Sequence, residues 1–272
     1  MINLKIPVGI SDFEKIRKNQ YYFVDKSGLI EELLNTESNE VTLITRPRRF
    51  GKTLGMSMLA SFFDIRRDSS ELFRGLKISQ KEELCQKWMN QYPVLFVTFK
   101  DVDGLDFQSA KEMLRIQIAD RCNEYLCLIS SEKVNENDKA IFRQLADVVK
   151  GDVSDAMLKT GIALIMRMLQ DYYEKPVILL LDEYDVPLAK ASAHGYYAEM
   201  LEVMRAMIST ALKDNPSLRF AVVTGCLRIA KESIFTGLNN FKVYSITNVQ
   251  FDETFGFTDA EVKEMLHYYE LD

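Results

Sequence analysis

The chain has 272 residues, 47% of them hydrophobic and 27% charged, with a formal net charge of -6. That length is enough for one large domain, or one and a half, around a sizeable core. The negative charge argues against a protein that coats nucleic acid through its overall charge. Four cysteines without C-x-x-C spacing and only two histidines leave little from which to build a zinc site.

The N-terminal residues contain no charged region followed by an apolar core, which is the pattern of a signal peptide. No run of about 18 apolar residues, the length of a membrane helix, occurs in the chain. We therefore expect a soluble, cytoplasmic protein that has no membrane partner.

The first predicted strand, Val41–Thr45, runs directly into the sequence Thr45-Arg-Pro-Arg-Arg-Phe-Gly-Lys-Thr53. This sequence is similar to the phosphate-binding pattern G-x-x-x-x-G-K-[ST], and Gly51–Thr53 fit the second half of that pattern. Arg46 stands where the first glycine is usual, and Pro47 follows it. Pro47 is expected to hold the loop stiff in place of the missing glycine. For Arg46 we favour a structural role.

The chemistry of this loop depends on its second half. Backbone N–H groups at the start of a helix point at phosphate oxygens, and the helix dipole favours negative charge there. We predict a helix over Leu54–Phe63, with Lys52 reaching the terminal phosphates and Thr53 holding a magnesium ion. Arg48 and Arg49 have two interpretations, because guanidinium groups pair with nucleotide phosphates and also with a nucleic-acid backbone.

The middle of the chain alternates short apolar runs with longer amphipathic stretches, which indicates a parallel sheet covered by helices. A second strand is predicted at Val94–Phe99. Helices are predicted at Phe107–Ile129 and Asp155–Tyr173, where apolar residues recur close to helical spacing. The long interval before the next strand predicts a helical elaboration at this point.

A third strand is predicted at Val177–Leu181, a run of aliphatic residues that suits a strand buried on both faces of a parallel sheet. Asp182 and Glu183 follow at its carboxyl end. In a nucleoside triphosphatase the aspartate of such a pair binds the magnesium shell, and the glutamate polarises the attacking water. Agreement between this pair and the loop at 45–53 favours a nucleotide site over a strand that merely ends in acidic turn residues.

After a helix predicted at Tyr196–Lys213, a fourth strand is predicted at Phe220–Thr224. Thr224 stands at the end of that strand, where we predict that its hydroxyl senses the terminal phosphate. Arg228 follows shortly after and is a candidate to stabilise charge in the transition state. A surface or salt-bridging role for Arg228 is equally compatible with the sequence.

A fifth strand is predicted at Val243–Ile246, and Thr258 with Glu261 predicts a capping box that opens a C-terminal helix. The fold class we expect is α/β: a P-loop NTPase with a five-stranded, mainly parallel sheet flanked by helices, a helical insertion and the start of a C-terminal helical lid. We expect the core, with an N-terminal nucleotide-contact segment, at 1–255 and a truncated lid at 256–272. The late helix suggests a fragment of a longer protein; the alternative is a terminal helix that packs on the core.

These motifs resemble those of the bacterial and archaeal AAA-ATPase-like family. The resemblance is carried by Arg46–Thr53, Leu181–Asp185, Thr224–Asn240, Pro7–Ile16 and Tyr22–Lys26. It covers nearly the whole chain and implies that an arginine at position 46 is normal for the family. Members continue into a helical lid and a restriction-endonuclease-like nuclease domain, so the resemblance implies a C-terminal effector domain, absent from this chain, through which nucleic acid would be a partner.

The resemblance also implies ATP as the nucleotide, ADP as the product and Mg²⁺ as the cofactor. We expect nucleotide contacts from Arg49, Phe50, Gly51, Lys52, Thr53, Leu54 and Thr224, magnesium contacts from Thr53 and Asp182, and catalytic roles for Glu183, Lys52 and Arg228. By analogy with related ATPases, Val8–Val24 is expected to contact the adenine base, with Phe13, Tyr22 or Phe23 as candidates. An oligomer and an arginine supplied by a second copy are left open.

Three functions follow from the sequence. The first is a module that binds ATP and hydrolyses it with magnesium. The second is a regulatory switch that binds ATP with negligible turnover and controls a separate effector or nuclease domain. The third is a nucleic-acid-binding module that uses Arg46, Arg48 and Arg49, for which affinity would fall steeply with salt.

Overall fold

The computed structural model describes residues 4–35, 40–149, 153–226, 234–235 and 241–271. The chain divides into two compact units. The loop unit consists of Met1–Ser38, Arg46–Gln91 and Tyr244–Asp272, and the sheet unit consists of Asn39–Thr45 and Tyr92–Val243. Each unit is therefore assembled from pieces of sequence that are separated along the chain.

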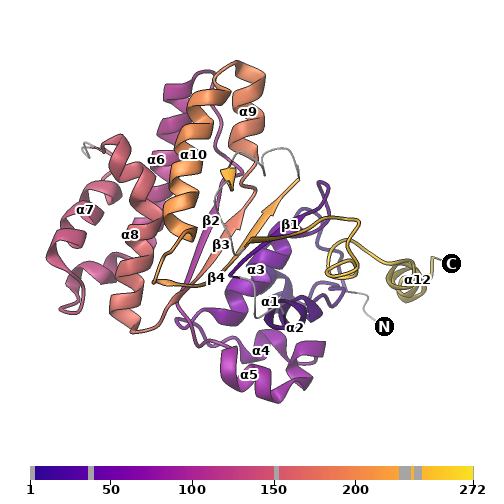
Figure 1. Ribbon diagram of the computed structural model, residues 1–272. Coiled ribbons are helices and arrows are strands. Elements are labelled where there is room, and N and C mark those ends of the chain that lie inside the picture. The colour runs from indigo at the N-terminus through magenta and orange to yellow at the C-terminus, as the bar shows by residue number, and fades with distance from the viewer. Residues whose placement is uncertain (1–3, 36–39, 150–152, 227–233, 236–240, 272) are drawn as a thin grey trace. The chain divides into compact units, whose positions relative to one another are not determined.

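The sheet unit is built on a five-stranded sheet with strand order β2-β3-β4-β1-β5 (Figure 1). The strands are β1 Val41–Thr45, β2 Val94–Thr98, β3 Val177–Asp182, β4 Leu218–Gly225 and β5 Phe241–Tyr244. The pairs β1/β4, β2/β3 and β3/β4 are parallel. Every residue of β3 is buried, as expected for a central strand with both faces covered. The predicted α/β class with a five-stranded, mainly parallel sheet is confirmed.

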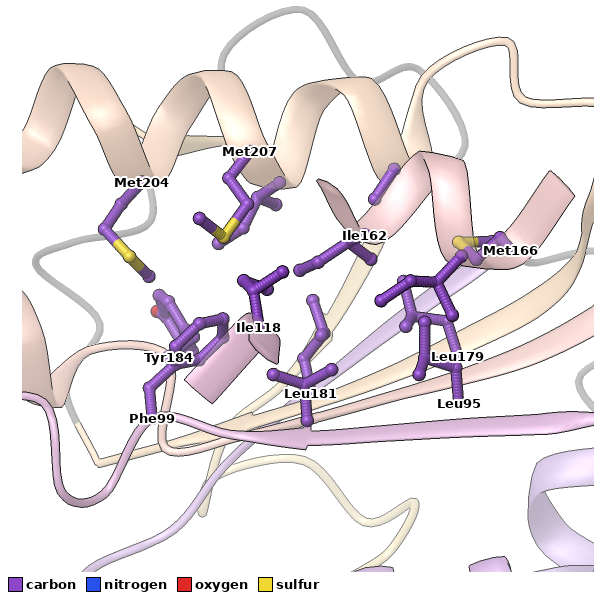
Figure 2. Close-up of a cluster of buried hydrophobic side chains, with 14 of the residues drawn as sticks. Leu95, Phe99, Ile118, Ile162, Met166, Leu179, Leu181, Tyr184, Met204 and Met207 are labelled. Atoms are coloured by element: carbon purple, nitrogen blue, oxygen red, sulfur yellow. The ribbon is translucent and has the colours of Figure 1, made fainter. Parts of the chain in front are cut away.

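Helices cover one face of this sheet. The helices packed on the strands are α6 Phe107–Glu124, α8 Asp155–Tyr173 and α10 Tyr197–Leu212. The same unit contains α9 Val186–His194, which packs on α10, and α7 Glu136–Ala146, which packs on α6 and α8, with a short 3-10 helix at Leu126–Ser130. Figure 2 shows Met204 and Met207 of α10 pointing toward the sheet. Ile162 of α8 lies beside them, above Leu181 of β3 (Figure 2). These apolar side chains interlock in one buried cluster, which removes their surface from water.

The helical elaboration between β2 and β3 was predicted, and α8 has the predicted bounds. The predicted helix Phe107–Ile129 is too long, since α6 ends at Glu124. Tyr125 leaves the helical conformation with φ of -116°, and its buried hydroxyl donates to the Val94 carbonyl at 2.5 Å. That tertiary hydrogen bond favours ending the helix there.

The described helices of the loop unit are short apart from one. They are α1 Phe13–Lys18, α2 Gly28–Leu34, α3 Lys52–Phe63, α4 Ser70–Phe73, α5 Glu82–Trp88 and α12 Asp259–Tyr268, with a 3-10 helix at Lys77–Gln80. Aromatic rings join several of them: the ring centroid of Phe73 lies 4.9 Å from that of Phe13 and 5.2 Å from that of Phe62. No helix in the described part of the chain is long and apolar enough to cross a membrane.

Candidate functional site

The predicted phosphate loop, Arg46–Thr53, leads directly into α3. Gly51 is the N-cap of this helix, with a φ of 76° in the left-handed region that favours glycine. Arg49 is also left-handed, with a φ of 69°. Because Gly51 has no side chain, no capping group of its own competes for the first N–H groups of the helix. A loop of this conformation at the positive end of a helix dipole is a typical anion-binding concavity.

Lys52 folds back over the loop. Its ammonium group donates to the carbonyl oxygens of Arg46 and Pro47, each at 3.0 Å. The side chain is buried, with an exposed fraction of 4%, and the neighbouring Thr53 is half-buried. The positive charge is therefore held against the loop backbone, where a phosphate group would gain a charge-assisted contact.

Arg46 is part of the interior of the loop unit, with an exposed fraction of only 2%. Its guanidinium group donates to the carbonyl of Tyr244 at 3.0 Å and to the carbonyl of Phe251 at 2.7 Å. It also lies 5.8 Å from the ring centroid of Phe255. Burial lowers the pKa of Arg46, and nearby carboxylates oppose that shift. The structural interpretation of Arg46 is confirmed by these contacts.

The other two arginines of the loop are placed differently. Arg48 and Arg49 are exposed, and Arg49 lines a cavity beside the loop. The three arginines therefore do not form one surface, and the nucleic-acid interpretation retains only Arg48 and Arg49 as exposed groups.

This cavity has a volume of about 300 Å³. Part of its wall comes from the loop and the first turns of α3: Arg49, Phe50, Gly51 and Leu54. Tyr22 and Phe23 of the N-terminal segment line it as well. Phe13 instead is fully buried, and its ring packs edge-on against Phe23 with centroids 5.5 Å apart. Of the three aromatic candidates for a base contact, Tyr22 and Phe23 thus reach the cavity, which has the size of a small-ligand pocket.

Helix α12 forms another side of the cavity through Met265. The predicted capping box of Thr258 and Glu261 is present at its start. The Lys26 ammonium group lies 2.6 Å from both carboxylate oxygens of Glu261. Burial alone would raise the pKa of Glu261, but the hydrogen bonds from Lys26 and Thr258 outweigh burial, so the pKa lies below its ordinary value. The Tyr22 ring also packs against the ring of Tyr268, with centroids 5.0 Å apart.

In the sheet unit, Asp182 ends β3 with a fully buried side chain. The Thr224 hydroxyl on β4 donates to its carboxylate, and the Phe99 N–H donates to its main-chain carbonyl at 3.0 Å. Thr224 also pairs in register with Ile44 near the end of β1. A hydroxyl that fixes a buried carboxylate in one orientation is typical of the partners that surround a metal-binding aspartate.

Glu183 follows Asp182 and is half-buried. Its φ of 54° lies in the left-handed region, which is uncommon for a residue with a side chain. Its neighbours hold this conformation: the Tyr184 N–H donates to the Thr224 carbonyl at 3.2 Å, and the Val186 N–H donates to the Glu183 carbonyl at 3.1 Å. Backbone conformations of this kind cluster at functional turns.

The predicted residues thus fall into two described sets. The loop unit holds Arg49–Leu54, and the sheet unit holds Asp182, Glu183 and Thr224. Arg228 lies outside the described residues. Within the described ranges, no three His, Cys, Asp or Glu side chains are grouped to hold a metal ion. Magnesium in nucleotide sites is commonly bound by one or two protein oxygens together with phosphates, and the oxygens of Asp182 and Thr53 are of that chemical type.

Some residues near these two sets were given no site role in the sequence analysis. Lys26 and Met265 both line the cavity. The contact of Lys26 with Glu261 forms only through folding, since the two residues are 235 positions apart along the chain. Asp185 did give a signal in the sequence: it is a third acidic residue, separated from the Asp182–Glu183 pair by Tyr184, and it is buried.

The sequence of this chain is similar to that of a known protein family. The model of the family described as "Predicted AAA-ATPase" matches residues 7–235. An "uncharacterized protein in vnfD 5'region" from Azotobacter chroococcum mcd 1 is 29% identical over 269 residues, covering 96% of this chain and 45% of that protein. The chain therefore spans less than half the length of this relative. No solved structure matches this chain. Because the family model covers most of the chain, the chain belongs to the AAA-ATPase-like family.

Proposed function

We propose that this chain binds ATP with magnesium and hydrolyses the terminal phosphate. The observation that carries the proposal is the cavity beside the loop. Gly51 and Leu54 line that cavity, and Gly51 is also the left-handed N-cap of α3. A place for a flat apolar base and a place for phosphates therefore adjoin each other. Membership of a family described as predicted AAA-ATPases supports the same function.

In the loop unit, the backbone N–H groups of Gly51–Thr53 and the Lys52 ammonium group bind the phosphates. Lys52 then exchanges its contacts to the Arg46 and Pro47 carbonyls, which are hydrogen bonds of ordinary length, for contacts to charged oxygens. The base stacks among Tyr22, Phe23 and Leu54.

The charge of the cavity wall favours adenine over guanine. The charged residues among its described lining are Lys26 and Arg49, and no carboxylate is among them. Guanine presents N–H donors that are well matched by a carboxylate acceptor, whereas adenine does not require a carboxylate in the cavity wall. We therefore expect ATP to compete with GTP for this chain and to bind more tightly.

In the sheet unit, the carboxyl ends of β3 and β4 supply the groups for hydrolysis. Asp182, together with the Thr53 hydroxyl, holds the magnesium ion, which supplies positive charge to the phosphates. Thr224 orients Asp182 and senses the terminal phosphate. Glu183 positions a water molecule and accepts its proton as the new phosphorus–oxygen bond forms and the bond to ADP breaks.

Two substitutions test the proposal, each with a matched control. Lys52→Ala should abolish ATP binding, while Lys81→Ala, which removes an exposed lysine of the same unit, should leave it intact. Glu183→Gln should keep ATP binding and lower turnover by about 10²–10⁴-fold, as expected for loss of a general base. Glu174→Gln is its control, because Glu174 is also a left-handed glutamate but has a mostly exposed side chain.

Bound nucleotide and released phosphate should be measured on the same samples. Turnover by the parent chain that Glu183→Gln removes supports the ATPase, and turnover that persists in Glu183→Gln refutes the assigned base. Tight binding with negligible phosphate release from the parent supports the regulatory switch instead. Absence of nucleotide binding by the parent chain contradicts both.

A further inference from the structure

The turn that follows β3 is fastened to the end of β4 by a second carboxylate, Asp185. This residue is buried, with an exposed fraction of 3%. One of its carboxylate oxygens accepts a hydrogen bond from the Cys226 N–H at 2.9 Å. Thr224 of β4 makes two further hydrogen bonds to this segment, because its hydroxyl donates to the Asp182 carboxylate and its carbonyl accepts from the Tyr184 N–H.

The position of Asp185 in its own helix makes this contact unusual. Asp185 is the N-cap of α9, where an aspartate ordinarily accepts a hydrogen bond from the first N–H groups of the helix. Its side chain makes no such capping bond, and instead reaches the Cys226 N–H across the sheet edge. The carboxylate therefore links the turn to the end of β4 and does not cap its own helix.

Gly225 allows the two chains to approach this closely. A Cβ atom at Gly225 would lie 2.5 Å from Cε1 of the Tyr184 ring and 2.9 Å from a carboxylate oxygen of Asp185. Both distances are shorter than real carbon contacts, so a larger residue would push the turn away from β4. The ring of Tyr184 is itself fixed in the core, fully buried and 5.2 Å from the ring of Phe235 (Figure 2 shows Tyr184).

We propose that Asp185 is a positioning residue for the ATP hydrolysis proposed above: it holds the Gly225–Cys226 backbone against the turn and so fixes the spacing between Glu183 and Thr224. The proposal rests on the proposed function. Glu183 has a left-handed backbone conformation, and its neighbours Asp182 and Tyr184 are both hydrogen-bonded to Thr224. The hydrogen bond from the Cys226 N–H to Asp185 adds a further link between the turn and the end of β4, one residue beyond Gly225. A small misplacement of Glu183 or Thr224 is expected to lower the rate of hydrolysis rather than the affinity for ATP.

The test compares Asp185→Ala and Asp185→Asn. Asp185→Ala removes the acceptor for the Cys226 N–H, and we expect kcat to fall by about 10- to 100-fold, with the KM for ATP changed less than twofold because the loop Arg46–Thr53 is intact. Asp185→Asn keeps a carbonyl oxygen that accepts the same bond, and we expect it to recover most of the parental kcat. Asp138→Asn is the matched control, since Asp138 is another buried aspartate of the sheet unit but pairs with Arg167 at 2.7 Å. It should lower stability with little change in kcat.

A second measurement does not depend on turnover. Hydrogen exchange of the peptide 218–226 should show loss of protection at Cys226 in Asp185→Ala and retained protection in Asp185→Asn. If the parent chain hydrolyses no ATP, the proposed function fails while this exchange measurement still tests the contact. Parental kcat in Asp185→Ala, unchanged protection at Cys226, or an equal loss of kcat in Asp138→Asn would each overturn the positioning role.

Discussion

Phe251 explains why the loop unit needs a buried arginine at position 46. Phe251 is fully buried and left-handed, with a φ of 63°, so it needs support from its surroundings. Its carbonyl accepts from Arg46 at 2.7 Å, and its N–H donates to the Glu32 carboxylate at 2.8 Å. Burial raises the pKa of Glu32, while the Phe251 N–H and the Arg46 charge oppose that rise. Arg46 and Glu32 therefore satisfy both backbone groups of a residue that no strand or helix supports.

Arg46→Met tests this account. The substitution keeps an apolar side chain of similar length but leaves the carbonyls of Tyr244 and Phe251 without their guanidinium donor. Because buried carbonyls that lose a charged donor are costly, we expect the free energy of unfolding to fall by about 3 kcal/mol. Urea denaturation followed by tryptophan fluorescence measures it, since Trp88 is the one tryptophan of the chain and lies in the same unit.

The matched control is Arg48→Met, which makes the same chemical change two residues away on an exposed side chain. Surface substitutions of this kind change stability by no more than about 0.5 kcal/mol. Equal losses in the two variants would mean that burial and hydrogen bonding of Arg46 do not matter.

Among the helices and strands, the sequence predicted correctly those that are marked by a pattern within their own residues. β1 and β3 are continuous apolar runs, and α8 carries an apolar stripe with a serine N-cap, so their bounds agree with prediction or differ by one residue. β5 was placed two residues too late, because Ser245 and Asn248 form a hydrogen-bonded turn directly after Tyr244. Short helices such as α1 and α9 were not predicted, since helices of this length depend on tertiary packing.

The candidate site residues also divide into those marked by a contiguous motif and those brought together only by folding. The loop Arg46–Thr53 and the Asp182–Glu183 pair are contiguous in sequence, so their residue types alone indicated phosphate and magnesium chemistry. The wall that α12 contributes to the cavity was not predictable, because it depends on contacts between the two ends of the chain. The Leu4 carbonyl, for example, accepts from the Tyr269 hydroxyl at 2.5 Å.

One partly buried ion pair contributes to the contact of α12 with the N-terminal segment. α12 itself buries no residue fully, and the Lys26–Glu261 pair is only 15% and 20% exposed. We expect Lys26→Met and Glu261→Gln each to increase hydrogen exchange in residues 259–268. A double-mutant cycle should give a coupling free energy of about 1 kcal/mol, at the upper end for partly exposed pairs. Lys18→Met, which breaks the more exposed Lys18–Glu14 pair of α1, should leave exchange in α12 unchanged.

The same pair predicts a dependence on pH. The folded pKa of Glu261 lies below its ordinary value of 4.5, so its contribution is complete above that value and is lost as the pH falls through the folded pKa. Exchange protection of α12 should therefore be constant near neutral pH and should fall in acid below about 4.5. Glu261→Gln should remove this acid-dependent step. A step that persists in Glu261→Gln would assign it to another group.

For the whole molecule, the proposed function requires the two units to act on one ligand. The chain leaves the sheet unit after Thr45, returns after Gln91 and leaves it again after Val243. The proposed phosphate contacts belong to the loop unit, and the proposed magnesium and water contacts of Asp182 and Glu183 belong to the sheet unit. A nucleotide that engages both sets must stabilise both units, whereas one held by the loop alone would stabilise only the loop unit.

A non-hydrolysable ATP analogue with magnesium therefore distinguishes these cases. At a concentration 100 times its Kd, a ligand that binds only the folded state stabilises it by about 2.7 kcal/mol. We expect hydrogen exchange to slow both in residues 46–63 and in residues 177–186. Lys52→Ala should remove protection from both, because it removes binding. Asp182→Asn should keep protection of the loop and lose the magnesium-dependent protection at 177–186, since a neutral amide is a poor magnesium ligand. Protection confined to the loop unit in the parent chain would contradict a shared nucleotide and would leave Asp182 and Glu183 without a part in its hydrolysis.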